Sequence, residues 1–181
     1  MKNSIVFDDL YRYTGQRKLF VLIKMLFSNK SFRQLYLYRK VQATKGLTKV
    51  LYRFLLRLFT KSLYIELPHS AVLGSGALFI HPIGITINSK AIIGKNLTML
   101  KGSTIGNCKR GELEGAPVIG DNVYIGLNST VVGNIKIGND VMICANTFVN
   151  FDVPDHSIVL GSPGIVHHKD WATEGYIINQ I

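Results

Sequence analysis

Two patterns of hydrophobic residues divide the chain near residue 65. From about residue 70 onward, an aliphatic residue recurs at every sixth position, at Ile119, Ile125, Val131, Ile137, Ile143 and Val149. A second small or aliphatic residue follows most of these after four positions, at Val123, Ser129, Ile135, Val141 and Thr147. The same period extends upstream through Ile87, Ile93, Met99 and Ile105.

A period of six residues fits neither an α-helix nor a single flat strand. It corresponds to one short strand and one tight corner per hexapeptide, and three such units close one triangular coil. Glycine follows several of the aliphatic residues, and glycine or Asn/Asp is expected at the tight corners, where a positive φ costs these residues little. The pattern therefore predicts a mainly β fold, a parallel β-helix solenoid in which each coil packs on its neighbours.

The period is interrupted at two places. Phe79 and Ile87 are eight residues apart, which leaves two extra residues beside His81. Ile105 and Ile119 are fourteen residues apart, so a loop is expected over residues 107–117. A solenoid admits insertions only at its corners, and functional groups are commonly carried there. We therefore expect the functional site near these corners.

The first part of the chain has helical periodicity. Residues 16–28 and 48–63 space their apolar side chains as amphipathic helices do, with Lys and Arg between them. A break is expected at residues 29–31, with Ser31 capping the next helix. We therefore divide the chain into a short N-terminal α-helical region (1–65), a solenoid domain (66–168) and a C-terminal tail (169–181).

The net charge of +10 belongs to the helical region. Residues 1–65 hold 14 Lys and Arg against 2 acids, a balance of +12, and the rest holds 7 against 9, a balance of −2. The simplest interpretation is that the helices pack on the solenoid or on a partner subunit. The alternative is a peripheral contact with an anionic membrane through residues 1–65. No nucleic-acid-binding motif accompanies the charge, so nucleic acid is not expected as a partner.

The composition narrows the class of protein further. Hydrophobic residues make up 47% of the chain, which is too apolar for a disordered chain. Cys108 and Cys144 form no CxxC motif and no disulfide framework, which is typical of reduced thiols in the cytoplasm. The apolar run over residues 19–27 contains Lys24 and is too short to span a bilayer. We expect no signal peptide and a cytoplasmic location, peripheral at the inner face of the membrane if the basic region contacts lipid.

The motifs resemble those of the hexapeptide-repeat acyltransferases, which fold as left-handed parallel β-helices. The resemblance covers about residues 66–169 and rests on IELPHSAVLGSG, FIHPIGITIN, PVIGDNVYIG, VVGNIKIGNDVMICAN and DVPDHSIVLGSPG. Within the family, the chain looks most like the serine acetyltransferase branch, and closest to its short members associated with surface polysaccharides. The handedness of the solenoid is implied by the resemblance alone.

The resemblance implies an acetyl-CoA-dependent O-acetyltransferase that needs no metal. His81 matches the family's catalytic histidine, and histidine can accept a proton near neutral pH. Glu66 matches the acid that lies fifteen residues earlier, and its carboxylate would orient the imidazole of His81. His81 would deprotonate an acceptor hydroxyl that attacks the thioester directly, without a covalent intermediate on either cysteine. The resemblance also implies a homotrimer with active sites shared between subunits.

The same resemblance suggests where acetyl-CoA would bind. The matching positions are Asn107, Leu127, Ala145 and the turn at Ser162, and Lys169 would meet a CoA phosphate. The γ-class carbonic anhydrases use three histidines on this scaffold, but residues 82–155 contain no histidine. A histidine-based metal site is therefore not expected.

The sequence specifies the acceptor of the acetyl group less clearly than it specifies the reaction. The serine enzymes carry an acid just before the catalytic histidine, where this chain has Ile80, and an Arg-His pair where it has Gly115 and Ala116. Because zwitterionic serine needs charged partners, these departures favour a sugar hydroxyl in polysaccharide synthesis over L-serine. A non-catalytic trimeric scaffold or membrane-surface module is the remaining alternative.

Overall fold

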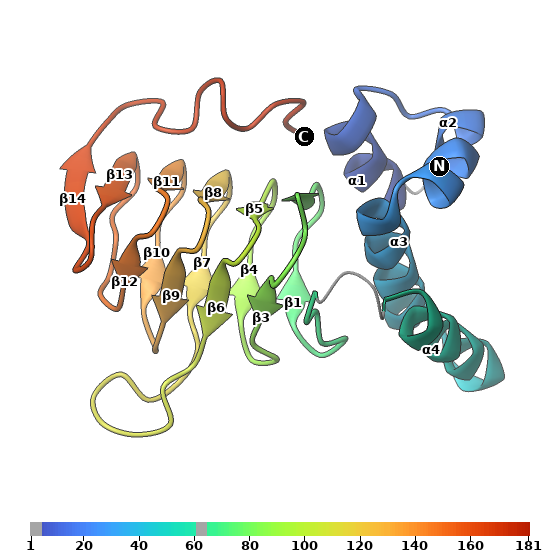
Figure 1. Cartoon of the computed structure of the whole chain (residues 1–181), viewed down its shortest axis with the longest axis horizontal. Coiled ribbons are helices and arrows are strands. Elements are labelled where there is room, and N and C mark those ends of the chain that lie inside the picture. The colour runs from blue at the N-terminus through green and yellow to red at the C-terminus, as the bar shows by residue number, and fades with distance from the viewer. Residues whose placement is uncertain (1–4, 61–64) are drawn as a thin grey trace.

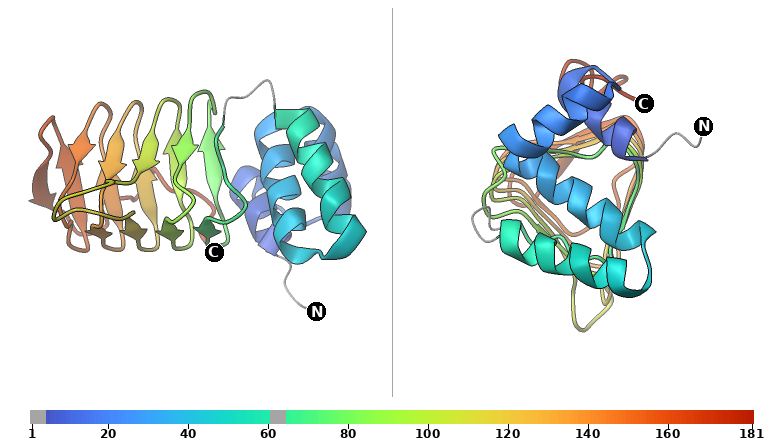
Figure 2. Two further views of the ribbon diagram at one scale, coloured as in Figure 1. Left: turned by 90° about the horizontal axis from the view of Figure 1, so that it is seen from below. Right: turned by 90° about the vertical axis from the view of Figure 1, so that its right-hand side faces the viewer.

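The computed structural model describes residues 5–60 and 65–181 and places a helical cap at one end of a triangular solenoid (Figure 1). The cap contains α1 (Ile5–Thr14), α2 (Leu19–Ser28), α3 (Lys30–Ala43) and α4 (Gly46–Thr60). Figure 2 shows the helices stacked across the first coil, with the solenoid extending away from them. This confirms the predicted fold class of a mainly β parallel solenoid with N-terminal helices.

The helix boundaries differ from expectation at two points. The N-cap of α3 is Asn29, whose side chain accepts a hydrogen bond from the Phe32 backbone N–H at 2.9 Å, so the prediction of Ser31 as cap was wrong. Ser31 instead lies inside α3, where its hydroxyl contacts the Phe79 carbonyl of the solenoid. Helix α4 begins at Gly46, and the last part of the expected helix, residues 61–64, lies outside the described residues.

Three sheets form the sides of the solenoid. Sheet I contains β1 (Val72–Leu73), β4 (Ile92–Ile93), β7 (Val118–Ile119) and β10 (Lys136–Ile137). Sheet II contains β2 (Leu78–Ile80), β5 (Thr98–Leu100), β8 (Val123–Ile125), β11 (Val141–Ile143), β13 (Ser157–Leu160) and β14 (Ile165–His168). Sheet III contains β3 (Thr86–Ile87), β6 (Thr104–Gly106), β9 (Thr130–Val132) and β12 (Phe148–Val149). Neighbouring strands are parallel, except that β14 pairs antiparallel with β13.

The six-residue period supplies the interior of the solenoid. In sheet I, Ile93 lies in register between Leu73 and Ile119, and the other sheets stack their aliphatic residues in the same way. The six residues that define the period between 119 and 149 are each at most 3% exposed. Burial of these columns is the main stabilising contribution, since each coil alone has no enclosed core.

The three edges of the solenoid have different characters. The His81 edge, between sheets II and III, turns through residues 81–84, 101–103, 126–129 and 144–147. The turn at residues 161–163, which joins β13 to β14 within sheet II, stacks on the end of this edge. The loop edge, between sheets III and I, carries residues 107–117, which project from the solenoid as the yellow loop below the strands in Figure 1. The tail edge, between sheets I and II, turns through Asn96, Asn122, Asp140 and His156, all with positive φ.

The C-terminal tail runs back along the tail edge toward α1 (Figure 1). Its last residue, Ile181, donates its backbone N–H to the Asn96 side chain at 3.2 Å. Asn179 donates to the Arg12 carbonyl of α1 at 3.5 Å. The tail therefore joins the last coil to the helical cap.

Within residues 5–60 and 65–181, we find no helix with the length and hydropathy needed to cross a bilayer.

Candidate functional site

His81 lies at an irregular corner directly after β2. Its φ of +48° is a left-handed conformation, which is uncommon for a residue other than glycine and often marks a functional position. The Ile83 N–H donates to the His81 carbonyl at 2.7 Å and closes a tight turn around the two extra residues. The sequence prediction of a bulge here is confirmed, and the His81 side chain is exposed.

A cavity of about 410 Å³ lies between His81 and the helical cap. One wall consists of residues 78–82, and the other consists of Tyr13 and residues 28–31 at the junction of α2 and α3. The cap is held here because the Tyr13 hydroxyl contacts the Ser31 hydroxyl at 2.8 Å and accepts from the Phe79 N–H at 3.1 Å. Burial raises the pKa of Tyr13 to about 12, so this phenol stays neutral and structural.

Sequence reasoning did not identify the helical wall of this cavity. Among the lining side chains that the structure describes, Lys30 carries the formal charge. Lys30 lies beside the cavity because α3 packs on the first coil. No spacing of residues in the sequence predicted this packing. The cavity therefore combines an exposed imidazole with one ammonium group and an otherwise neutral wall.

Glu66 lies one coil below the strand that follows His81. Its N–H donates to the Ile85 carbonyl at 2.8 Å, and its carbonyl accepts from the Ile87 N–H at 2.9 Å, so it is in register with Thr86 in sheet III. Its side chain is exposed. Across the described ranges, no hydrogen bond joins the Glu66 carboxylate to the His81 ring. Its orienting role therefore stays a prediction, because catalytic hydrogen bonds often tighten only when substrate is bound.

Three of the residues predicted to contact CoA follow one another along the His81 edge. The Asn146 N–H donates to the Leu127 carbonyl at 2.7 Å, which stacks the corner containing Ala145 on that of Leu127. The Phe148 N–H donates to the Gly161 carbonyl at 3.1 Å, which places the Ser162 turn on the next coil. The structure thus brings Leu127, Ala145 and Ser162 onto the edge that begins at His81.

The other two predicted contacts lie on different edges. Asn107 accepts a hydrogen bond from Asn88 at 2.7 Å at the base of the loop edge, where it lines a cavity of about 710 Å³ under the loop. Lys169 donates its N–H to the His156 carbonyl at 2.8 Å, on the tail edge. A single chain therefore does not assemble the full predicted set, and any common site would need edges from different subunits.

A polar cluster on the tail edge was missed by sequence reasoning. The Asp140 carboxylate contacts His156 Nδ1 at 2.9 Å and accepts from the Thr173 hydroxyl at 2.6 Å and the Ala172 N–H at 2.9 Å. Burial alone would raise the pKa of Asp140, but these hydrogen bonds together lower it. The same contact with Asp140 raises the pKa of His156. The cluster anchors the tail and lies on a different edge from His81.

No group of three His, Cys, Asp or Glu side chains that could hold a metal ion occurs within residues 5–60 and 65–181.

The sequence was also compared with those of known proteins and protein families. The family model described as "Bacterial transferase hexapeptide (six repeats)" matches residues 116–150. The serine acetyltransferase of Staphylococcus aureus (strain Mu50 / ATCC 700699) is 34% identical over 142 residues, which are 78% of this chain and 63% of that protein. Serine acetyltransferase 4 of Arabidopsis thaliana is 37% identical over 110 residues, 59% of this chain and 31% of that protein. The chain thus spans less than two thirds of the length of these relatives.

Solved structures show the same architecture. The structure of Neisseria gonorrhoeae serine acetyltransferase in complex with serine matches with a TM-score of 0.73 and 30% identity, over 90% of this chain and 67% of that chain. The serine acetyltransferase of Brucella abortus strain S19 in complex with coenzyme A matches with a TM-score of 0.73 and 23% identity, over 91% of this chain and 66% of that chain. At this identity, the match supports the fold alone. From the repeat motif, the stacked coils and these likenesses, the chain belongs to the hexapeptide-repeat transferase family.

Proposed function

We propose that this protein is an O-acetyltransferase that uses acetyl-CoA as co-substrate. The observation that carries the proposal is the position of His81, which has an exposed imidazole, a left-handed backbone and a cavity of about 410 Å³ beside it. The edge that leads away from His81 carries Leu127, Ala145 and Ser162. A thioester bound along this edge would end beside the imidazole.

The reaction needs one base and no covalent intermediate. The His81 imidazole accepts the proton of the acceptor hydroxyl as its oxygen forms a bond to the thioester carbonyl carbon. The carbon–sulfur bond then breaks, and the departing CoA thiolate takes the proton from the imidazolium. Glu66, one coil away, would act as a positioning residue that stabilises the imidazolium.

Neither cysteine is suited to replace this mechanism with a double displacement, although Cys144 lies on the His81 edge. Burial raises the pKa of the Cys144 thiol, which disfavours the nucleophilic thiolate. Cys108 pairs through its backbone with Gly115 at the base of the loop, on a different edge from His81. Direct attack on the thioester therefore fits the chain better.

The comparisons favour L-serine as acceptor over the sugar that the sequence departures suggested. The relatives described above are serine acetyltransferases, and none of them supports an acceptor in polysaccharide synthesis. Lys30 lines the cavity beside His81, and its ammonium group could bind the carboxylate of serine. We therefore place L-serine first.

A sugar hydroxyl is the second candidate, because the cavity offers no described acid for the ammonium group of serine. Ile80 lines the cavity where the serine enzymes carry an acid. Gly115 and Ala116, in place of an Arg-His pair, provide no side-chain charge on the loop edge. A neutral acceptor would not need these partners.

A thiol-release assay with acetyl-CoA tests both acceptors. L-serine, a panel of sugars and a panel of nucleotide sugars are compared on the wild type and on Ile80→Asp. If serine is the acceptor, the wild type releases CoA with serine, and Ile80→Asp lowers the KM for serine. Release with a sugar alone identifies the second candidate. No release with any acceptor, together with no CoA binding by calorimetry, would indicate a non-catalytic scaffold.

We also propose that the active assembly is a homotrimer. His81 and Asn107 lie on different edges of one chain, so a groove that contains both needs two subunits. Sedimentation equilibrium measures the assembly directly, and mixing His81→Ala with Asn107→Ala chains tests for shared sites. Recovery of activity in the mixture is expected, and its absence in a confirmed trimer would place the site within one chain.

A further inference from the structure

Helix α4 exposes a continuous apolar face. Leu47, Val50, Leu51, Phe54 and Leu58 follow the spacing i, i+3, i+4, i+7 and i+11, which places them on one side of the helix. Their exposed fractions lie between 52% and 88%. Tyr52 and Leu55, outside this face, are half-buried, and α4 packs on α3. An apolar face of this kind on a soluble protein marks an interaction surface.

The exposed side of α2 adds further apolar side chains. Leu19, Phe20, Ile23 and Phe27 are 49% to 82% exposed. An apolar hollow of about 230 Å³ connects the ends of α2 and α4, and Phe27 and Phe59 lie in its walls together with Arg33. The guanidinium of Arg33 lies 5.0 Å from the centre of the Phe59 ring. The apolar surfaces of α2 and α4 are thus connected.

Cationic side chains lie beside this surface. Lys49, Arg53 and Arg57 are four residues apart and form a stripe next to the apolar face of α4. In the described part of the chain, none of these three has an ion-pair partner. Long basic side chains can lay their stems along apolar surface while the charge reaches outward.

The cap has no free acid to balance this charge. Its two acids are Asp8 and Asp9. Asp8 pairs with Arg17 at 3.2 Å, and Asp9 is buried against Arg39 at 2.8 Å. The outward surface of the cap is therefore apolar and cationic, which complements a surface that is apolar inside and anionic at its boundary.

We propose that the exposed faces of α2 and α4 dock this protein on an anionic lipid bilayer. Helix α4 would lie in the plane of the interface, with Phe54 and its neighbours among the acyl chains and Arg53 and Arg57 at the headgroups. Docking of a second copy fits less well. An antiparallel two-fold pairing through α4 would bring identical basic stripes side by side with no acid between them.

The surface is next to the candidate active site. Phe27, which is 82% exposed, directly precedes Ser28, which lines the cavity beside His81. Docking would bring the helical wall of that cavity close to the headgroups. The acetyl-transfer chemistry does not depend on this docking, so the two can be tested separately.

Vesicle co-sedimentation of the full chain tests the proposal. The vesicles contain phosphatidylcholine alone or with about 30% phosphatidylserine, at low and high salt. The wild type is expected to bind only the anionic vesicles, and to be released as salt rises. Leu51→Gln/Phe54→Gln and Arg53→Gln/Arg57→Gln should each weaken binding by about tenfold or more. The matched control Lys95→Gln/Lys136→Gln removes the same charge from the solenoid and should bind as the wild type does.

Two further measurements make the result decisive. Far-UV circular dichroism and thermal unfolding of each variant show that it is folded, whether or not the protein binds CoA. Light scattering shows whether the apolar variant lowers the oligomeric state. Failure of the wild type to bind anionic vesicles would overturn the proposal, as would unchanged binding by both α4 variants. A smaller oligomer with unchanged vesicle binding would assign the face to a second copy.

Discussion

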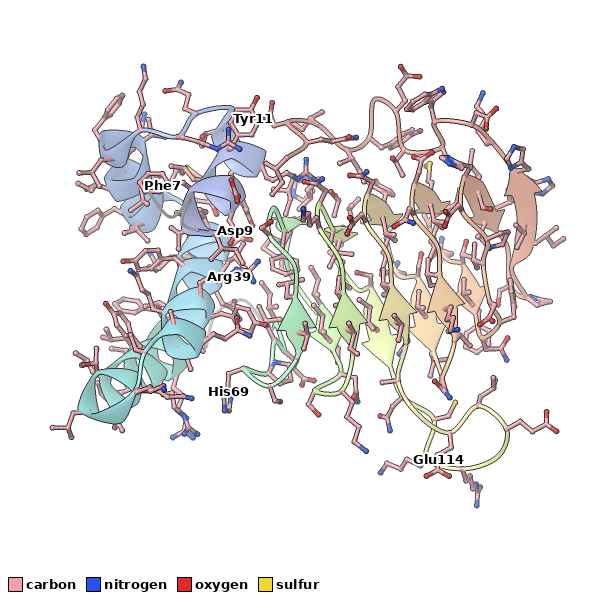
Figure 3. All side chains as sticks on the ribbon, turned by 180° about the vertical axis from the view of Figure 1, so that it is seen from behind. Phe7, Asp9, Tyr11, Arg39, His69 and Glu114 are labelled. Carbon is pink, nitrogen blue, oxygen red and sulfur yellow. The ribbon has the colours of Figure 1, made fainter. Side chains whose placement is uncertain are left out.

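The Asp9 carboxylate and the Arg39 guanidinium form a buried ion pair, 2.8 Å apart, at the junction of the helical cap and the first coil (Figure 3). Both side chains are 2% exposed. Arg39 also donates to the carbonyls of Leu73 and Gly74, and Asp9 accepts from the backbone N–H groups of Gly76 and Ala77. The pair therefore links α1, α3 and the solenoid at one point.

Removal of Asp9 should destabilise the protein strongly. Asp9→Ala leaves the Arg39 charge buried without a counter-ion, which is expected to cost about 3–5 kcal/mol in the free energy of unfolding. The adjacent variant Asp8→Ala breaks only the exposed pair with Arg17 and should cost about 0–1 kcal/mol. Urea unfolding followed by circular dichroism measures both. Equal, small losses would show that the junction does not depend on the buried pair.

His81→Ala should reduce acetyl transfer by about 100- to 10,000-fold while acetyl-CoA still binds, because the change removes the base and leaves the other contacts. His69→Ala is the matched control. His69 is exposed on the first coil, where Figure 3 shows it at the lower margin of the solenoid, and its loss should leave activity unchanged. Near wild-type turnover by His81→Ala would disprove the assignment.

Glu66→Gln should lower kcat by about tenfold or more, since it removes the charge that would stabilise the imidazolium. The KM for acetyl-CoA should stay unchanged, because Glu66 is not among the residues expected to contact the donor. Glu112→Gln, at an exposed position of the projecting loop, serves as a control for loss of a carboxylate. A loss of stability with an unchanged kcat would indicate a merely structural role for Glu66.

The attachment of the C-terminal tail should depend on pH. The contact with Asp140 raises the pKa of His156 above its ordinary value of 6.5, so its stabilisation is complete below pH 6.5 and is lost as pH rises through the raised pKa. The pKa of Asp140 is lowered below 3.8, so its contribution is lost only as pH falls through that lower value. The tail should therefore be held best between these two limits.

Trp171 reports on this transition, because it is the one tryptophan of the chain and lines the hollow beside His156. Its fluorescence should titrate with a midpoint above pH 6.5 in the wild type. His156→Gln should abolish the titration, and His167→Gln should leave it in place. A titration that persists without His156 would assign it to another group.

Gly126→Ala should disturb the His81 edge. A Cβ at this position would lie 2.7 Å from the Ala145 backbone nitrogen, so the stacked corners would have to move apart. The expected cost is about 1–3 kcal/mol in stability, with weaker binding of CoA. Gly106→Ala is the control, because its Cβ would meet only side-chain atoms of Val132 and Thr104, at 3.4 Å or more. Unchanged CoA binding in Gly126→Ala would place the donor elsewhere.

The sequence alone determined the solenoid, since a strict period of six is produced by the local geometry of strand and corner and needs no knowledge of distant contacts. It also located the bulge at His81 and the loop over residues 107–117, because each appears as a displacement of that period. The resemblance of the motifs then indicated which histidine and which acid to examine. These features depend on neighbours in the chain or on the next coil.

Only the tertiary structure decided what surrounds them. The cavity wall formed by Tyr13 and Lys30, the Asp9–Arg39 pair and the return of the tail to Asp140 all join segments that are far apart in the chain. No periodicity records such contacts, because they depend on how the amphipathic helices and the tail pack on the finished solenoid. The same packing decided which helical face stays uncovered, and so separated the buried stripe of α4 from the exposed one.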